Sequence, residues 1–220
     1  MTWLSRSWRA IHKRPAAGWA AIFVAGMVFW GAFNWSLEAT NTETFCISCH
    51  VMKKFVYEEF RESRHFANRT GVRATCPDCH VPKDWIHKVM RKAAATNELF
   101  HWLRGSIDTR EKFEAKRLVL ARHVWDSMAA ADSRECRNCH GIGFMNRDAQ
   151  APRARWMHEL ADGWGKTCID CHKGVVHALP RDFDKEAEMD ALHDRMETDK
   201  VECRLCHENI GGPPPGDDWD

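Results

Sequence analysis

The sequence predicts a mainly α-helical protein, with a single N-terminal transmembrane helix followed by a small domain of helices and loops with little or no β-sheet. Three observations support this fold class: an uncharged apolar run near the start, five short cysteine motifs in the rest of the chain, and two helix-length segments between the second and third motifs. No segment shows the alternation of apolar and polar residues that is typical of a half-buried strand.

The first element is the apolar run. No charged residue occurs from Pro15 to Leu37, and this length is enough to cross a bilayer once. Four basic residues precede the run, whereas Glu38 and Glu43 follow it, so the N-terminal end is predicted to stay in the cytoplasm while the rest is exported. A cleaved signal peptide is the alternative, but the run is longer than a usual signal-peptide core and no clear A-x-A site follows it. The sequence therefore favours an uncleaved single-pass anchor.

The next elements are five copies of the pattern Cys-x-x-Cys-His, which contain all ten cysteines of the chain. Two thiols at this spacing can each form a thioether to one vinyl group of a haem, and the adjacent histidine can bind the iron as its proximal ligand. A zinc site or a disulfide scaffold is the alternative, but it leaves the constant histidine unexplained. The sequence therefore predicts five covalently attached c-type haems. The predicted attachment residues are Cys46, Cys49, Cys76, Cys79, Cys136, Cys139, Cys168, Cys171, Cys203 and Cys206, and the predicted proximal ligands are His50, His80, His140, His172 and His207.

Five haems in 220 residues would make the macrocycles themselves the hydrophobic core. Their propionates would also make the mature protein more acidic than the formal net charge of +1, and no basic footprint for nucleic acid is present. Haem attachment to this motif takes place on the outer side of the bacterial inner membrane, which agrees with the predicted topology. We therefore expect a haem domain in the periplasm, anchored to the inner membrane.

The spacing of the motifs divides the domain. Successive first cysteines lie 30, 60, 32 and 35 residues apart, which predicts two haem pairs and an appended fifth haem, and suggests the duplication of a two-haem unit. The only long interval without a motif runs from residue 81 to residue 135.

Two helices are predicted in this interval. The first runs from about Asp84, a candidate N-cap, to Arg104, with Gly105 as its stop. Its apolar side either packs against a haem or lies on anionic lipid headgroups. The second starts at the capping-box-like sequence Asp108-Thr-Arg-Glu111 and continues to about Ala131, with a buried side that carries His123.

The second axial ligands must come from outside the motifs. A low-spin haem needs a distal ligand, usually histidine or methionine, and that ligand tunes its potential. His12 is predicted to be cytoplasmic, so five irons compete for seven periplasmic histidines. These are His65, His87, His101, His123, His158, His177 and His193.

Several stretches together resemble the NapC/NirT family, over roughly residues 15 to 180. They are the first motif with Val51 and Met52, residues 58–65, residues 68–82, residues 107–113, and residues 167–174 with His177. Members of that family are membrane-anchored tetrahaem cytochromes that oxidise quinol and pass electrons to periplasmic reductases. The resemblance implies the same activity here.

The resemblance also implies roles for particular residues. Met52 matches the axial methionine that some members place at the first haem, and Lys92 matches a lysine of their quinol site, with Glu98 as a weaker candidate for the nearby acidic group. The family's distal histidines correspond to His65, His123, His158 and His177, with the pairing left open.

The chain departs from the family pattern at two places. Lys83 stands where some relatives have histidine. The motif at Cys203 is additional, and His193, ten residues before it, is the candidate distal ligand of the fifth haem.

The sequence thus predicts four segments: a cytoplasmic tip and anchor (1–38), a tetrahaem domain (39–180), an extension with the fifth haem (181–210) and a disordered tail (211–220). The predicted function is oxidation of membrane quinol, either menaquinol or ubiquinol, and electron relay to a periplasmic reductase or soluble cytochrome. The alternatives are reverse transfer from a periplasmic donor into the quinone pool, a catalytic multihaem reductase, and a structural anchor for a soluble enzyme. All five motifs end in histidine, which disfavours an open catalytic haem. A homo-oligomer stays open.

Overall fold

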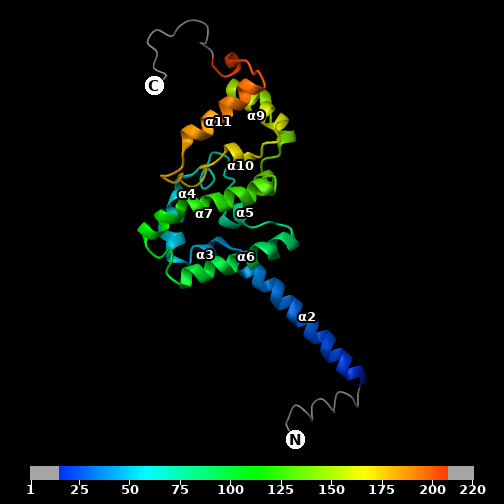
Figure 1. Ribbon diagram of the computed structural model, residues 1–220. Helices are drawn as coiled ribbons and strands as arrows, with labels where there is room; N and C mark the ends of the chain where they lie inside the picture. Colours follow the sequence, from blue (N-terminus) through cyan, green and yellow to red (C-terminus); the bar gives the residue numbers. More distant parts are fainter. Residues whose placement is uncertain (1–14, 208–220) are drawn as a thin grey trace.

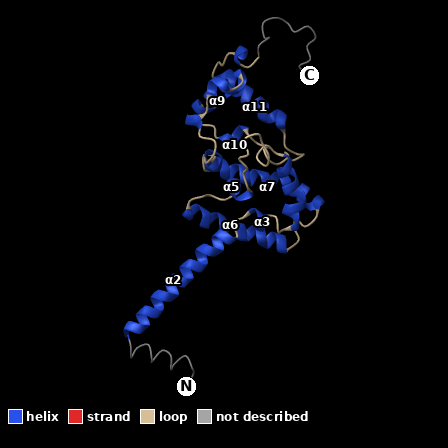
Figure 2. Cartoon of the chain, turned by 180° about the vertical axis from the view of Figure 1, so that it is seen from behind, coloured by secondary structure: helices blue, strands red, loops and turns tan. Residues whose placement is uncertain are grey.

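The computed structural model describes residues 15–207, and every regular element in that range is a helix (Figure 2). This confirms the predicted fold class. The basic cytoplasmic tip before Pro15, including His12, and the tail expected at residues 211–220 lie outside the described residues.

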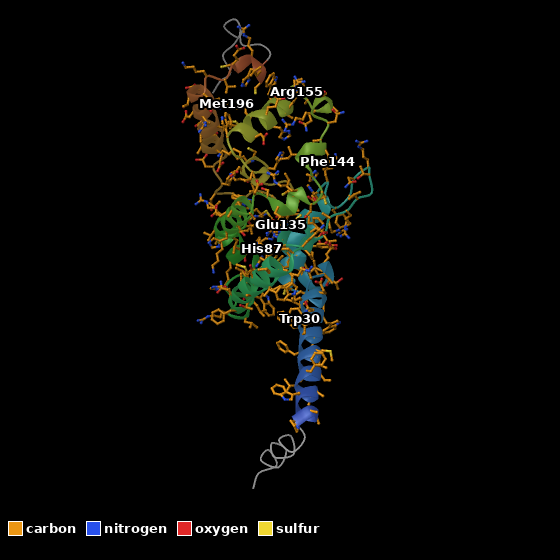
Figure 3. All side chains as sticks on the ribbon, turned by 90° about the vertical axis from the view of Figure 1, so that its right-hand side faces the viewer. Trp30, His87, Glu135, Phe144, Arg155 and Met196 are labelled. Atoms are coloured by element: carbon orange, nitrogen blue, oxygen red, sulfur yellow. The ribbon has the colours of Figure 1, made fainter. Side chains whose placement is uncertain are left out.

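The N-terminal helix α2 (Pro15–Ala39) is long and apolar enough to cross a membrane. It extends away from the rest of the chain (Figure 1), and its side chains, including the labelled Trp30, project outward along its length (Figure 3). Only Gly18 and Leu37 are buried among its residues. A helix with so much exposed apolar surface is suited to lipid rather than water.

The remaining helices form an elongated domain above α2 (Figure 1). Its two long helices are α6 (Trp85–Leu103) and α7 (Arg110–Ala130), with α6 next to α2. The other elements are α3 (Glu43–Cys46), the π-helix η1 (Met52–Val56), α4 (Tyr57–Glu62), α5 (Cys76–His80), α8 (Arg134–Arg137), η2 (Ile142–Phe144), η3 (Arg147–Ala149), α9 (Pro152–Gly163), α10 (Cys168–Cys171), α11 (Lys185–Thr198) and η4 (Cys203–Leu205).

The two predicted long helices are present, with one correction at the start of the second. Asp84 caps α6 as expected, because its carboxylate accepts a hydrogen bond from the backbone N–H of His87 at 3.1 Å. The cap of α7 is Thr109 and not Asp108. Asp108 instead forms an ion pair with Lys112 at 2.7 Å, so the carboxylate belongs to the turn before the helix.

Two helices near the C-terminal end, α9 and α11, were not predicted from the sequence. Both helices are rich in charged residues and neither buries a residue. The sequence therefore has no buried apolar face there that would predict a helix. The start of α11 is nevertheless marked by Asp184, which accepts a hydrogen bond from the N–H of Ala187 at 2.9 Å.

Side chains alone form a very small core. Val51, Phe55 and Phe113 make one buried cluster. The other buried apolar side chains in the described part of the chain are Leu37, Phe60, Ile169 and the prolines Pro77, Pro82 and Pro180. A domain of this size ordinarily buries a much larger apolar core. The shortage fits a domain whose interior is completed by large apolar cofactors.

Candidate functional site

The cysteine motifs adopt short helical turns that place both cysteines and the histidine together. In the last three motifs the N–H of the histidine donates to the carbonyl of the first cysteine, at 2.8 Å for His140, 2.8 Å for His172 and 3.0 Å for His207. The second and fourth turns also start with capping boxes, formed by Thr75 with Asp78 and by Thr167 with Asp170. The residue pattern therefore builds a rigid attachment turn.

The first four motif turns lie next to one another in chain order, and the fifth lies beside α9. Helix α3 packs against α5, and α5 packs against α8, although 60 residues separate the second and third motifs. The next link is a hydrogen bond from the N–H of Ile169 to Ser133 Oγ. The fifth motif is joined through α9, whose Arg153 Nε donates to the carbonyl of Cys206 at 3.2 Å and whose His158 faces His172 of the fourth motif. The line starts beside α2 and ends at the far end of the domain (Figure 1).

The link between the third and fourth motifs depends on Ser133, which is fully buried and has a left-handed backbone. Its hydroxyl accepts the hydrogen bond from Ile169 at 3.0 Å. We expect Ser133→Ala to reduce the free energy of unfolding by about 1–3 kcal/mol, because a buried N–H loses its acceptor. Denaturant unfolding followed by circular dichroism would measure this. An unchanged midpoint would show that the hydrogen bond is dispensable.

Four of the five motif histidines face a second imidazole. The pairs are His65 with His140, His80 with His177, His158 with His172, and His193 with His207, with ring centroids 6.1, 6.2, 6.0 and 6.4 Å apart. An imidazole nitrogen binds a metal at about 2 Å, so two imidazoles on opposite sides of one iron have centroids roughly 6 Å apart. The four separations therefore match the spacing of two axial ligands of one haem iron.

Two of these pairs join distant parts of the chain. His177 follows the fourth motif but lies beside His80 of the second, and His65 precedes the second motif but lies beside His140 of the third. His158 and His193 each face the motif that follows them. The long-range pairs thus interlock the two halves that the motif spacing suggested.

His123 has a different position from the one expected. It was predicted on the buried side of α7, but it is exposed, and no hydrogen bond, ion pair or ring contact of its side chain occurs within residues 15–207. His123 lies ten residues after Phe113, the buried residue of α7. Its side chain therefore points about 80° away from that of Phe113 around the helix axis. His87 contacts Asp84, and His101 contacts Phe100.

Burial keeps several of the paired imidazoles neutral. It lowers the pKa of His80 to about 4 and also lowers the pKa values of His65, His172 and His177. Neutral imidazole is the form that binds a metal.

A neighbouring side chain orients His158, and an ion-pair network fixes the segment that holds His177. His158 Nδ1 lies 2.8 Å from Gln150 Oε1, which can only accept a hydrogen bond, so Nδ1 carries the proton and Nε2 is left for a metal. Near His177, Glu59 accepts hydrogen bonds from Arg117 and from the N–H of Ala178. This network fixes the segment that holds His177.

The first motif differs from the other four, because no second histidine faces His50 among the described residues. The His50 ring packs edge-on against the Phe55 ring, with their centroids 6.0 Å apart. Met52 begins the π-helix η1 and is 37% exposed. Short π-helical segments of this kind often occur at functional sites.

The candidate quinol residues lie where α6 meets the end of α2. Lys92 Nζ donates to the carbonyl oxygen of Thr40 at 2.6 Å and to its hydroxyl at 3.1 Å. Desolvation lowers the pKa of Lys92, whereas the charge of Glu38 acts in the opposite direction, and Cys46 of the first motif is also a neighbour. Lys92 is therefore a partly buried amine beside the first motif.

The structure does not bring Lys92 and Glu98 together. Glu98 forms an ion pair with Arg91 at 2.9 Å. The carboxylate whose charge raises the pKa of Lys92 is Glu38, which also forms an ion pair with Lys88 at 2.6 Å. Sequence reasoning missed Glu38 and Thr40 as neighbours of this lysine, because they are about fifty residues away and no local pattern links them.

The residues present fit covalently bound haem. Each motif turn supplies two free thiols and an imidazole, four motifs have an opposing imidazole at the required separation, and the domain has little apolar core of its own.

Comparison with known proteins agrees with this donor set. Residues 11–182 match the model of the NapC/NirT cytochrome c family, N-terminal region. The chain is 62% identical over 165 residues to the denitrification system component NirT of Stutzerimonas stutzeri, covering 75% of this chain and 82% of that protein. It is 53% identical over 175 residues to the cytochrome c-type protein NapC of Escherichia coli K12, covering 79% and 88%.

A protein of Allochromatium vinosum described as a tetraheme cytochrome-c type is 47% identical over 163 residues, covering 74% of this chain and 88% of that protein. No solved structure matches. The family match ends before the fifth motif at Cys203. The chain belongs to the NapC/NirT cytochrome c family and is a multihaem c-type cytochrome of electron transport.

Proposed function

We propose that the protein binds five haems and that it oxidises membrane quinol and relays the electrons to a redox partner in the periplasm. The observation that carries the proposal is the row of five motif turns, which begins beside the apolar helix α2 and ends in the C-terminal extension. Each haem, once bound, can take up and release one electron. Because the turns follow one another away from α2, haems bound to them would form a single electron-transfer path that leads away from the membrane.

The axial ligands follow from the four histidine pairs. His177 would serve the second haem, His65 the third, His158 the fourth and His193 the fifth, each opposite its motif histidine. Met52 is the candidate axial ligand of the first haem, and His123 has no place in this scheme. Lys83 stands where some relatives have histidine. It is not needed as an axial ligand, because the second to fifth motif histidines each have an opposing histidine and Met52 is the candidate ligand at the first motif.

Quinol would be oxidised beside the first motif. Quinol loses two electrons and two protons, so the site needs a group that accepts a proton and holds a quinol oxygen. Lys92 can do both, because its pKa is lowered and its amine already hydrogen-bonds to oxygen atoms of Thr40. Glu38, paired with Lys88, offers a route for protons toward the surface.

The topology follows the charge pattern around α2. The haem domain would be periplasmic and α2 would hold it at the inner membrane, within reach of the quinol pool. The tetrahaem unit would comprise residues 39–180 and the added haem residues 181–210. The catalytic reductase alternative is disfavoured because the histidine pairs leave no open site at four of the motifs.

The test is anaerobic addition of a menaquinol analogue to the purified, detergent-solubilised protein, followed through haem absorbance. Rapid reduction is expected. If quinol fails to reduce the haems, while quinone oxidises protein that dithionite has reduced, the proposed direction is wrong and electrons flow into the quinone pool.

The fifth haem has its own prediction. The double variant Cys203→Ala with Cys206→Ala should lose one of five haems in intact mass spectrometry, because both thioethers of that haem are removed. Quinol should still reduce the remaining four, whereas transfer to an external acceptor should slow. A mass lower only by the two sulfur atoms that the substitutions remove would show that the fifth motif carries no haem.

The hydrogen-bond partner of His158 gives a further prediction. Gln150→Leu removes the acceptor at His158 Nδ1, and we expect the potential of the fourth haem to rise, because an imidazole without that hydrogen bond is a weaker donor to ferric iron. Potentiometric titration measures this. Gln150→Glu should shift the potential in the opposite direction, and identical titrations for both variants would contradict the role of this residue.

A further inference from the structure

Helix α6 carries a stripe of apolar side chains that remain more than half exposed, although the Arg104 guanidinium lies over the Phe100 ring, 5.5 Å from its centroid. Ile86 and Met90 are each 63% exposed, and Phe100 is 51% exposed. Their spacing places all three on one side of the helix. An exposed apolar stripe of this kind marks a contact with something outside the chain.

The opposite side of α6 makes the contacts with the rest of the protein. Lys88 binds Glu38, and Lys92 binds Thr40. Lys88 and Met90 are two residues apart, which places their side chains about 160° apart around the helix axis. The stripe therefore points away from α2 and from the first motif, so a haem bound there does not account for it.

The start of α6 is tied to the apolar part of α2. The Trp85 ring lies 5.3 Å from that of Trp30 and 6.3 Å from that of Phe33, and its Nε1–H donates to Asn34 Oδ1 at 2.8 Å. These α2 residues belong to the segment that is suited to span a membrane. The first turn of α6 thus lies beside the end of that segment (Figure 1).

Basic side chains stand at both ends of the stripe. Lys83 comes three residues before Ile86, and Arg104 comes four residues after Phe100. Both are exposed. Cationic side chains with long aliphatic stems, next to an apolar face, match the boundary between acyl chains and anionic headgroups.

We propose that α6 lies in the interfacial region of the membrane, with Ile86, Met90 and Phe100 against lipid acyl chains and Lys83 and Arg104 at lipid phosphates. The proposal rests on the proposed anchoring of the protein by α2. It gives the haem domain a second, lateral contact with the bilayer, which holds the Lys92 side of the helix at the membrane boundary.

Site-specific photocrosslinking to lipid tests this contact. The haem-loaded, full-length protein is placed in nanodiscs of phosphatidylcholine and phosphatidylglycerol, with p-benzoyl-L-phenylalanine replacing Ile86, Met90 or Phe100 one at a time. Phe23 of α2, 67% exposed, is the positive control, and Val119 of α7, 55% exposed, is the matched negative control. Intact mass spectrometry after illumination counts chains that have gained one phospholipid.

We expect the α6 positions to form lipid adducts several-fold more often than the Val119 position and nearly as often as the Phe23 position. Adducts at Phe23 with only background at α6 would overturn the proposal and leave the anchor intact. Background at Phe23 as well would reject anchoring by α2, and the interfacial placement with it. Crosslinks between two chains at α6 would show instead that the stripe joins copies of the protein.

Discussion

Replacing Lys92 by methionine should slow the quinol-driven reduction of the haems by about 10²-fold or more, which is the usual loss when a positioned proton acceptor is removed. Methionine is also unbranched and is one atom shorter, but it lacks the amine that hydrogen-bonds to Thr40. Stopped-flow absorbance with a menaquinol analogue gives the rate. Reduction by dithionite should remain complete, because it does not need the quinol site.

Two further variants separate the possible roles of this lysine. Lys88→Met removes a positive charge one turn away, at an ion pair with Glu38, and should have a much smaller effect. Lys92→Arg keeps the charge but not the ability to release a proton near neutral pH.

Because desolvation lowers the pKa of Lys92, its neutral fraction grows as pH rises toward that pKa. The advantage of the native protein over Lys92→Arg should therefore increase with pH. Equal quinol kinetics for native protein, Lys92→Met and Lys88→Met would remove Lys92 from the site.

Replacing His177 by alanine should convert one haem, the second, from low-spin to high-spin, because His80 then has no opposing imidazole. Quinol-driven reduction of the haems beyond it should fall sharply, since the second motif turn lies between the first and third. Electron paramagnetic resonance of the oxidised protein and stopped-flow absorbance measure the two effects.

The matched control is His123→Ala, which removes an exposed histidine without a partner in the described chain and should change neither measurement. If His177→Ala does not mature, His177→Met should keep a six-coordinate iron while raising its potential. A low-spin His177→Ala protein with native kinetics would show that His177 is not the ligand.

The sequence alone was sufficient to predict the apolar helix α2 and the two long helices, because each depends on a local pattern, and the haem attachment residues stay a prediction of the same local kind. Length and apolarity define α2, and the spacing of two cysteines and a histidine defines each attachment turn. The cap at Asp84 is likewise a local signal.

The pairing of histidines could not be predicted, because it depends on chain crossings. His177 lies 97 residues from His80 in the sequence, and nothing in the pattern around either one indicates the other. The same limit explains His123: the apolar residues of α7 predicted a buried side, but of that helix only Phe113 is buried. In a domain with so few buried side chains, apolar spacing is a poor guide to which residues face inward.

We propose that four of the haems have two histidine ligands, in the pairs that the structure brings together. Near-infrared magnetic circular dichroism of the oxidised, haem-loaded protein tests it most directly, because bis-histidine and histidine–methionine haems absorb at distinct energies. The expected spectrum corresponds to four bis-histidine haems per chain and one haem of different ligation. Fewer than four bis-histidine haems in the fully loaded protein would contradict the proposed pairs.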